Sequence, residues 1–244
     1  LKCGPLGFPV VDVAVNLADH LAALGRRVVL VDPDLRTGTA ALLVGVAPGG
    51  GLAEALAKPD RVDETFLEAA TVAAGERFHM LASEEPIGAG GHRPEALPAL
   101  VERLRALGHY VLLDLPRGCG PAELAVLRKA WFRLLVCGPV LASLRDAARL
   151  AAALDDGPLR RTLTVLNGAG APGALSARDV AKALGAAPDF TIAHRPKLMA
   201  EAANLGVPAV RSSRAFRAEI ARIAQDVCGA APRGTSLLER ILGR

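Results

Sequence analysis

Polar side chains that could bind a phosphate or a metal ion stand at the ends of three apolar segments. They are Asp32 and Asp34 after segment 27–32, Asp114 in segment 109–115, and Asn167 in segment 162–167. Segments so rich in Val and Leu are typical of strands buried in a parallel sheet, whose ligands bind beyond the carboxyl ends of the strands. A carboxylate there could hold Mg²⁺ or orient a water molecule, because Mg²⁺ takes one or two carboxylates together with phosphate oxygens. Taken singly, each acid could equally cap the loop or helix that follows it.

The elements that must position these residues follow from the apolar periodicity of the chain. Strands are expected at 27–32, 78–82, 109–115, 132–137, 162–167 and 190–193. Helices are expected at 10–24, 39–44, 52–57, 63–70, 94–107, 121–129, 143–154, 197–204, 213–228 and 236–242. Another helix follows Ser176, and both Ser143 and Ser176 open sequences that resemble a capping box. This alternation predicts an α/β fold with a mainly parallel sheet covered by helices on both faces, formed by residues 1–244 as a single domain.

Composition supports a large core and argues against several kinds of site. Of the 244 residues, 51% are apolar and only 3% are aromatic, so the core must be built from Ala, Leu and Val. The four cysteines form no CxxC pair, which argues against a structural zinc site or a disulfide framework and favours a reducing cytoplasm. No uncharged apolar run reaches the roughly 18 residues of a membrane-spanning helix. His92, in a glycine-rich loop, is expected to be a solvated residue rather than a ligand.

Charge is concentrated toward the C-terminal end of the chain. The net charge is +4, and residues 211–244 alone carry seven arginines against three acids. We expect an electrostatic partner to meet this end, although such clusters commonly form only a solvated helix face. Within the final segment, 235–244, the apolar side chains gather on one side of a short predicted helix; they are Leu237, Leu238, Ile241 and Leu242. This amphipathic tail could lie in a membrane interface, dock on a partner, or pack on the core.

Five segments of the sequence form a specific pattern when they are taken together and in this order. They are V-N-L-A with G-R-R-V-V-L-V-D-P-D-L-R-T-G-T-A-A-L-L-V-G (15–45), Y-V-L-L-D-L-P-R (110–117), L-A-S-L-R-D-A-A-R-L (141–150), L-S-A-R-D-V (175–180) and A-E-A-A-N-L-G-V-P (200–208). Together they resemble the CpaE/TadZ branch of the MinD/ParA ATPases, a P-loop family of the SIMIBI class. The resemblance implies a cytoplasmic pilus-assembly protein, which could be peripheral at the inner membrane or the cell pole.

The resemblance also implies roles for the polar residues. Asp34 matches the catalytic acid that faces the γ-phosphate and the attacking water, and Asp114 matches the catalytic acid that holds magnesium through water. Asn167 matches the residue that reads the adenine edge, and Pro196 matches the residue that lines the base. The cofactors implied are ATP and Mg²⁺, with no structural metal.

The phosphate-binding loop departs from the family pattern, which reads approximately K-G-G-V-G-K-T. Here the segment is K-C-G-P-L-G-F-P (2–9), in which Gly4 and Gly7 could still let the backbone approach a phosphate. Between Lys2 and Thr37 there is no Lys, Ser or Thr, so the P-loop lysine and the hydroxyl that binds Mg²⁺ are both missing. We therefore expect weakened binding of ATP and Mg²⁺ and negligible hydrolysis. Because a P-loop normally follows a strand, we expect the first strand, and any N-terminal receiver-like domain, upstream of Leu1.

Three functions are compatible with these observations. The first is a pseudo-ATPase or weak ATPase scaffold that localises a Tad/Flp-type pilus assembly or secretion machine. The second is an active MinD-like positioning ATPase, and the third is a ParA-like partition protein that binds DNA through its basic C-terminal region. Nucleic acid is the less expected partner. A homodimer in contact with pilus machinery is expected instead, with the small residues of 200–206 allowing close approach.

Overall fold

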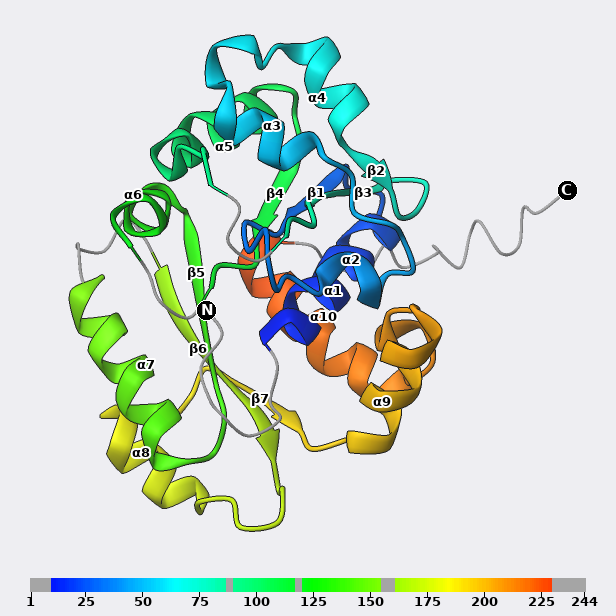
Figure 1. Ribbon diagram of the computed structural model, residues 1–244. Coiled ribbons are helices and arrows are strands. Elements are labelled where there is room, and N and C mark those ends of the chain that lie inside the picture. The colour runs from blue at the N-terminus through cyan, green and yellow to red at the C-terminus, as the bar shows by residue number, and fades with distance from the viewer. Residues whose placement is uncertain (1–9, 87–89, 117–119, 155–160, 230–244) are drawn as a thin grey trace, which may run out of the picture.

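The computed structural model describes residues 10–86, 90–116, 120–154 and 161–229, which form parallel strands between layers of helices (Figure 1). A four-stranded sheet has the order β2 (Val72–Ala73), β3 (Phe78–Leu81), β1 (Val28–Val31), β4 (Tyr110–Leu113). A three-stranded sheet has the order β5 (Phe132–Cys137), β6 (Arg161–Ala169), β7 (Phe190–Ala193). The strands pair in parallel, except that β2 is antiparallel to β3. The predicted α/β fold is confirmed, and β2 is an edge strand that the sequence did not predict.

Helices cover both faces of these sheets. They are α1 (Val10–Ala23), α2 (Ala40–Leu43), α3 (Gly51–Ala57), α4 (Glu64–Ala70), α5 (Leu97–Ala106), α6 (Pro121–Lys129), α7 (Leu141–Ala153), α8 (Ala177–Leu184), α9 (Pro196–Leu205) and α10 (Arg214–Cys228). Short 3-10 turns lie at η1 (Pro59–Arg61), η2 (Pro94–Ala96) and η3 (Ala209–Arg211). The helix expected at 94–107 thus begins as a 3-10 turn at Pro94, where the missing amide is not needed. The helix expected at 236–242 lies outside the described residues.

Strand β1 shows why the sheet needs helices on both faces. All of its side chains are buried, and alternate ones point in opposite directions. Val28 and Leu30 belong to the apolar cluster that includes α1 and α10, whereas Val29 and Val31 belong to the cluster that includes α3, α4 and α5. A smaller cluster joins α7 and α8 to the ends of β5 and β6. A continuous Val/Leu run is therefore required here, rather than the polar–apolar alternation of a half-exposed strand.

Two serines predicted as helix caps behave differently. Ser176 caps α8 as predicted, since its hydroxyl accepts a hydrogen bond of 3.2 Å from the amide of Asp179. Ser143 does not cap α7, which begins two residues earlier at Leu141. Its buried hydroxyl instead accepts a 2.9 Å bond from the amide of Gly138, in the turn that leads into the helix. The prediction of a cap at Ser143 was wrong, because this side chain bonds to a backbone group upstream of its own helix.

Candidate functional site

Two buried carboxyl groups stand side by side at the carboxyl ends of adjacent strands. Val31 pairs with Leu113 in the β1–β4 register, so Asp32 and Asp114 follow at equivalent positions. The backbone amide of Asp114 donates a 3.0 Å hydrogen bond to the carbonyl of Val31, which extends the ladder by one residue. Both acids are almost fully buried, at 1% and 0% exposure. The structure thus brings Asp32 and Asp114 to one edge of the sheet.

Asp32 organises the loop that follows β1. Its Oδ1 accepts a hydrogen bond of 3.2 Å from the amide of Asp34, and its Oδ2 accepts one of 3.2 Å from the amide of Ala40. The second bond satisfies a donor in the first turn of α2, where helix amides have no partner within the helix. Asp32 therefore acts as a structural cap, which is the simpler of the two expectations for this acid.

Asp34 lies in the loop that Asp32 holds, at the same edge of the sheet. Its Oδ1 accepts a hydrogen bond of 2.9 Å from the amide of Thr37, and its Oδ2 accepts one of 2.7 Å from the Thr37 hydroxyl. The carboxylate is partly exposed and folded against its own turn. The turn also requires Gly38, because a Cβ at this position would stand 2.5 Å from the carbonyl oxygen of Asp34 and 2.6 Å from Oδ2 of Asp32.

A further acid, Asp12, belongs to this edge and was missed by the sequence reasoning. It lies in the first turn of α1, near Asp114. Burial, together with the smaller effect of the negative charge of Asp114, raises the pKa of the Asp12 carboxyl from 3.8 to about 7. The available signal was an acid in the first turn of a predicted helix that directly follows the glycine- and proline-containing segment 2–9.

The other two predicted binding residues lie on the second sheet. Asn167 is near the carboxyl end of β6, opposite Ile192 of β7, at the start of an irregularity in the pairing. Pro196 is the first residue of α9, directly after β7, and is exposed. Both lie beyond or near strand ends, as expected, but on a different sheet from Asp34 and Asp114. The predicted roles of all four residues stay predictions, and Gly4 and Gly7 lie outside the described residues.

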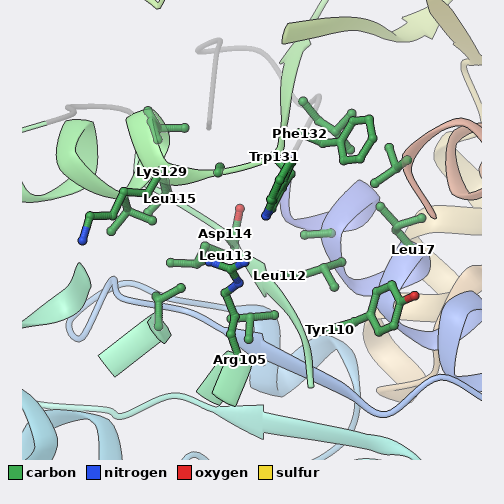
Figure 2. Close-up of a pocket in the computed structure, with 18 of the residues that line it drawn as sticks. Leu17, Arg105, Tyr110, Leu112, Leu113, Asp114, Leu115, Lys129, Trp131 and Phe132 are labelled. Carbon is green, nitrogen blue, oxygen red and sulfur yellow. The ribbon is translucent and has the colours of Figure 1, made fainter. Parts of the chain in front are cut away.

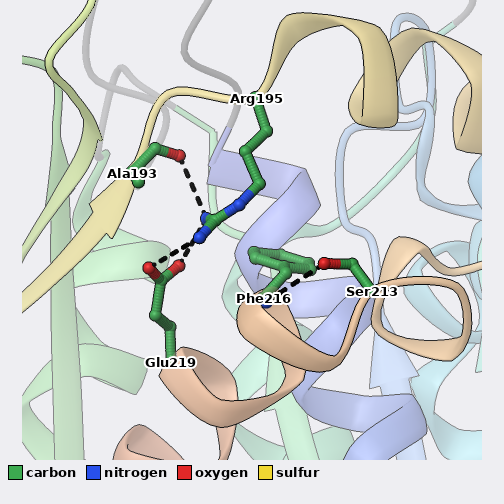
Figure 3. A network of polar contacts seen from close by, with 5 residues as sticks. All are labelled: Ala193, Arg195, Ser213, Phe216 and Glu219. Carbon is green, nitrogen blue, oxygen red and sulfur yellow. Dashed lines mark hydrogen bonds and ion pairs between the residues drawn. The ribbon is translucent and has the colours of Figure 1, made fainter.

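The loop between β7 and α9 is anchored by an ion pair (Figure 3). The Arg195 guanidinium donates two hydrogen bonds, of 2.6 and 2.9 Å, to the two carboxylate oxygens of Glu219 in α10. It also donates to the carbonyl of Ala193 at 3.3 Å and lies 5.9 Å from the centre of the Phe216 ring. Both partners of the ion pair are 21% exposed. This arrangement fixes the loop that presents Pro196.

The environment of His92 differs from the solvated loop that the sequence predicted. Its side chain is only 14% exposed, and its Nε2 lies 2.9 Å from a carboxylate oxygen of Glu85. The amide of Glu85 in turn donates a 2.8 Å bond to the carbonyl of Leu35, next to Asp34. The prediction that His92 is a solvated loop residue was therefore wrong. The residue is enclosed because its loop folds back toward the turn after β1.

The fold with this acidic edge is the P-loop α/β fold of the MinD/ParA type. The chain superposes on the cell-division ATPase MinD of Pyrococcus furiosus with a TM-score of 0.78 and 23% identity, covering 94% of this chain and 97% of that one. For MinD of Pyrococcus horikoshii, solved with Mg-ADP, the TM-score is 0.77 with 21% identity, and 93% of each chain is covered. For a ParA-family ATPase of Chlorobium tepidum the TM-score is 0.76 with 19% identity, over 88% of this chain and 91% of that one. No protein-family model and no curated protein sequence matches the chain.

The residues at this edge fit a nucleotide with Mg²⁺ only in part. Carboxylates such as those of Asp34 and Asp114 are suitable for Mg²⁺. However, Asp12 places a carboxyl in the first turn of α1, the part of a helix where a phosphate would be favoured by the amides and the helix dipole. Residues 3–36 also contain no Lys, Ser or Thr. Within the described ranges, no three His, Cys, Asp or Glu side chains gather as a metal site.

Proposed function

We propose that this chain is a positioning scaffold of the MinD/ParA type that hydrolyses ATP negligibly and serves to localise a Tad/Flp-type pilus assembly machine. Support for the first part comes from the fold, whose solved relatives include positioning ATPases such as MinD. Support for the second comes from the five ordered segments that resemble the CpaE/TadZ branch, including the 200–208 segment that begins within α9.

The main observation in support of negligible ATP hydrolysis is Asp12, an acid in the first turn of α1. A phosphoryl group needs cationic or amide donors at this place, whereas Asp12 offers a carboxyl group beside Asp114. Residues 3–36 contain no lysine, serine or threonine that could replace the P-loop lysine and hydroxyl. Removing a single positioned donor typically lowers an enzyme's rate roughly 100- to 1,000-fold, so the loss of two leaves negligible hydrolysis.

The test is phosphate release from ATP with Mg²⁺, measured on the purified chain and on Asp114→Asn. We expect both proteins to give the rate of buffer alone. The matched control for a lost carboxylate is Asp189→Asn, since Asp189 directly precedes β7 and accepts a hydrogen bond from the amide of Thr164 within β6. Magnesium-dependent turnover that Asp114→Asn abolishes and Asp189→Asn retains would contradict the proposal and favour an active MinD-like ATPase.

We also propose that the chain pairs with a second copy through a surface next to the acidic edge. Leu42 of α2 and Leu205 of α9 are 61% and 75% exposed, which is unusual for such large apolar side chains. Their helices approach closely, since a Cβ on Gly206 would stand 2.7 Å from the Cα of Gly45. The small residues of 200–206 thus also allow close contact between helices within the chain, whereas Leu42 and Leu205 stay exposed on the surface. Because α2 directly follows the Asp34 turn, pairing here would bring two acidic edges near each other.

Light scattering over a range of concentrations tests this surface. We expect the double variant Leu42→Ser with Leu205→Ser to lower the dimer fraction. The matched control is Leu141→Ser, which removes an equally exposed leucine (69%) from the start of α7. A strict monomer before any substitution, or equal loss of dimer in both variants, would contradict the proposal.

The alternative of a DNA-binding partition protein has less support. Two arginines toward the C-terminal end, Arg211 and Arg217, are exposed, but their guanidinium groups are engaged by partners within the chain. Arg211 pairs with Asp19 at 2.5 Å, and Arg217 donates hydrogen bonds to the backbone carbonyls of Val210 and Arg211 at 2.9 and 2.8 Å. Phosphate contacts would make DNA binding fall steeply with salt. We therefore expect no salt-sensitive shift of a DNA duplex in a gel; a shift that salt removes would favour this alternative.

Membrane contact stays a proposal that concerns the tail 235–244, which lies outside the described residues. In the part of the chain that is described, none of the helices combines the length and apolar character needed to cross a bilayer. Sedimentation with anionic liposomes, comparing the full chain with one that ends at Pro232, tests whether the tail binds a membrane surface. Equal and negligible pelleting of both proteins would contradict a peripheral membrane location.

A further inference from the structure

An apolar slot and a polar pocket lie at separate places in the described part of the chain. The slot, of about 420 Å³, lies between β4 and β5 and has Asp114 among its lining residues, so it adjoins the acidic edge (Figure 2). The pocket has a volume of about 590 Å³ and shares no lining residue with the slot. We call it the basic pocket, because three arginines line it together with one histidine and two acids. Its polar side chains are Asp19, His20, Glu76, Arg77, Arg211 and Arg217.

The basic pocket lies at the opposite end of the sheet from the acidic edge. Phe78, the first residue of β3, lines the pocket and pairs with Val28, the first residue of β1. Asp32 follows the last residue of β1, roughly 13 Å further along the strand. The walls of the pocket come from the last turns of α1, the turn between β2 and β3, and the segment from η3 to the start of α10. A ligand here would therefore contact three segments that are remote in the sequence, away from the residues expected to bind a nucleotide.

Arg211 and Asp19 form an ion pair within the pocket. The Nε of Arg211 donates hydrogen bonds of 3.0 and 3.2 Å to the two carboxylate oxygens of Asp19, and its Nη2 donates to Oδ1. The Asp19 side chain is only 9% exposed, and these hydrogen bonds raise the pKa of Arg211. The Nη1 group of Arg211 has no acceptor among the residues that the structure describes. The pair thus neutralises the more buried acid of the pocket and leaves donors for another oxyanion.

Arg217 is held by backbone carbonyls rather than by an acid. Its Nε donates a hydrogen bond of 2.9 Å to the carbonyl of Val210, and its Nη2 donates one of 2.8 Å to the carbonyl of Arg211. Both acceptors are uncharged, so they do not cancel the positive charge of the guanidinium. Its Nη1 group has no acceptor within the described ranges. Since the orientation of Arg217 is already fixed, this side chain would lose little conformational entropy when it binds a ligand.

His20 and Arg77 complete the polar lining. His20 lies in the last turn of α1, and burial, followed by the positive charge of Arg217, lowers the pKa of its imidazole, although Asp19 acts in the opposite direction. The ring is thus mainly neutral at pH 7, where it can donate one hydrogen bond and accept one. Arg77, in the turn between β2 and β3, is exposed, and its guanidinium has no partner in the part of the chain that the structure describes. With Glu76 as the remaining acid, also exposed, the pocket retains an excess of positive charge.

We propose that the basic pocket binds the phosphate group of a small phosphorylated molecule. Guanidinium groups match phosphate oxygens with paired N–H donors, and a phosphate monoester offers three terminal oxygens, whereas a carboxylate offers two. Donors from Arg77, Arg211 and Arg217 therefore suit a phosphate better than a carboxylate. The volume of about 590 Å³ exceeds the need of a phosphate group alone and is typical of pockets for small organic ligands. The apolar wall that includes Ala22 and Ala23 would contact the rest of the molecule.

Nuclear magnetic resonance of the histidine side chains tests the site, with glycerol 3-phosphate as the probe. A dianion beside His20 favours the protonated imidazole, so we expect the probe to raise the pKa of His20 and to shift its signal, with smaller changes at the other four histidines. The variant His20→Gln identifies the signal by removing it. Glycerol and succinate, added separately, are the controls for the organic part and for carboxylates. No shift of the His20 signal at millimolar probe, or an equal shift with succinate, would overturn the proposal.

Arg77→Gln removes a donor whose loss should leave the fold intact, because this exposed side chain has no partner among the described residues. We expect the substitution to weaken the binding of glycerol 3-phosphate at least about tenfold, since a hydrogen bond from a charged donor is lost. The matched control is Arg178→Gln, which removes an exposed arginine from α8. Equal affinity of the two variants for the probe would overturn the proposal.

Thermal unfolding gives a second readout and separates a free molecule from a phosphorylated partner protein. Glycerol 3-phosphate should raise the melting temperature of the original chain and of Arg178→Gln more than that of Arg77→Gln, since a ligand that binds only the folded state stabilises it. A peptide that contains phosphoserine serves as the comparison. If the peptide raises the melting temperature and shifts the His20 signal whereas glycerol 3-phosphate does neither, the pocket binds a phosphorylated protein segment and the proposal of a small molecule is wrong.

Discussion

The side chain of Asn16 links the first helix to a segment almost two hundred residues later in the sequence. Its Oδ1 accepts a hydrogen bond of 2.7 Å from the amide of Val210, and its Nδ2 donates one of 2.7 Å to the carbonyl of Asp12. Asn16 is 3% exposed and Val210 is 2% exposed, so water does not compete for these groups. One amide thereby joins the first turn of α1, which borders the acidic edge, to the turn that precedes α10.

The first prediction concerns this bond. Replacing Asn16 by Leu should lower the free energy of unfolding by roughly 1–3 kcal/mol, because the buried amide of Val210 loses its acceptor. Urea unfolding followed by circular dichroism measures the change. Asn204→Leu is the matched control, since Asn204 is exposed in α9. If both variants unfold at the same urea concentration, the Asn16–Val210 bond contributes nothing measurable.

A second prediction concerns the pH dependence of stability. The pKa of Asp12 is about 7 in the folded chain against an ordinary 3.8, so the folded state binds a proton between these values that the unfolded state has released. The stabilisation that this proton provides is fully present below about pH 4 and is lost as the pH rises to about 7. The free energy of unfolding then falls by at most about 4 kcal/mol. Above about pH 7 both states are ionised and the loss is complete.

Asp12→Asn should remove this pH dependence, because the amide stays neutral. We expect the variant to be more stable than the original chain at pH 8 and nearly equal to it at pH 4, as measured by thermal unfolding. Asp60→Asn changes an exposed acid and is the control. A pH profile that is identical for the chain and for Asp12→Asn would show that Asp12 is not responsible.

The third prediction concerns the turn after β1. Gly38→Ala should destabilise the chain by about 1–3 kcal/mol, because the new methyl group would overlap the Asp34 carbonyl and the Asp32 carboxylate, and both belong to the site edge. Gly50→Ala is the control, since a Cβ there meets no atom within 4 Å. Thermal unfolding of the two variants provides the comparison. Equal melting temperatures would mean that the turn rearranges without cost.

The fourth prediction concerns the ion pair between Arg195 and Glu219. Glu219→Gln should cost about 1.5–3 kcal/mol, because the partly buried guanidinium loses its charged partner and one of the two acceptor oxygens that it bonds at 2.6 and 2.9 Å. The control is Glu102→Gln, which breaks an exposed pair with Arg105 and should cost less than about 1 kcal/mol. Urea unfolding measures both. An equal effect would show that the Arg195 loop is not held by this pair.

Periodicity and strand register explain which parts of the fold could be predicted. The run that became β1 is apolar over its whole length, and the runs that became β5 and β7 each contain a single polar residue, Arg133 and Thr191, since buried parallel strands accept few polar side chains. In a parallel sheet, acids that end neighbouring strands must meet at one edge, and Asp32 and Asp114 do so. Strand β2 escaped prediction because two residues carry no periodicity. Ser143 and His92 were misjudged because their partners, Gly138 and Glu85, are set by how the chain folds back on itself.

The sequence alone determined the alternation of strands and helices, the acids that end the strands, and the lack of Lys, Ser or Thr in residues 3–36. These are properties of residue type and spacing, which need no contact between distant segments. Tertiary structure alone decided that Asp12 lies near Asp114, that Arg211 and Arg217 are engaged within the molecule, and that β4 and β5 border an apolar slot. Each of these depends on which segments pack together across the molecule, because a side chain's charge state and a strand's unpaired edge are set by neighbours that are remote in the sequence.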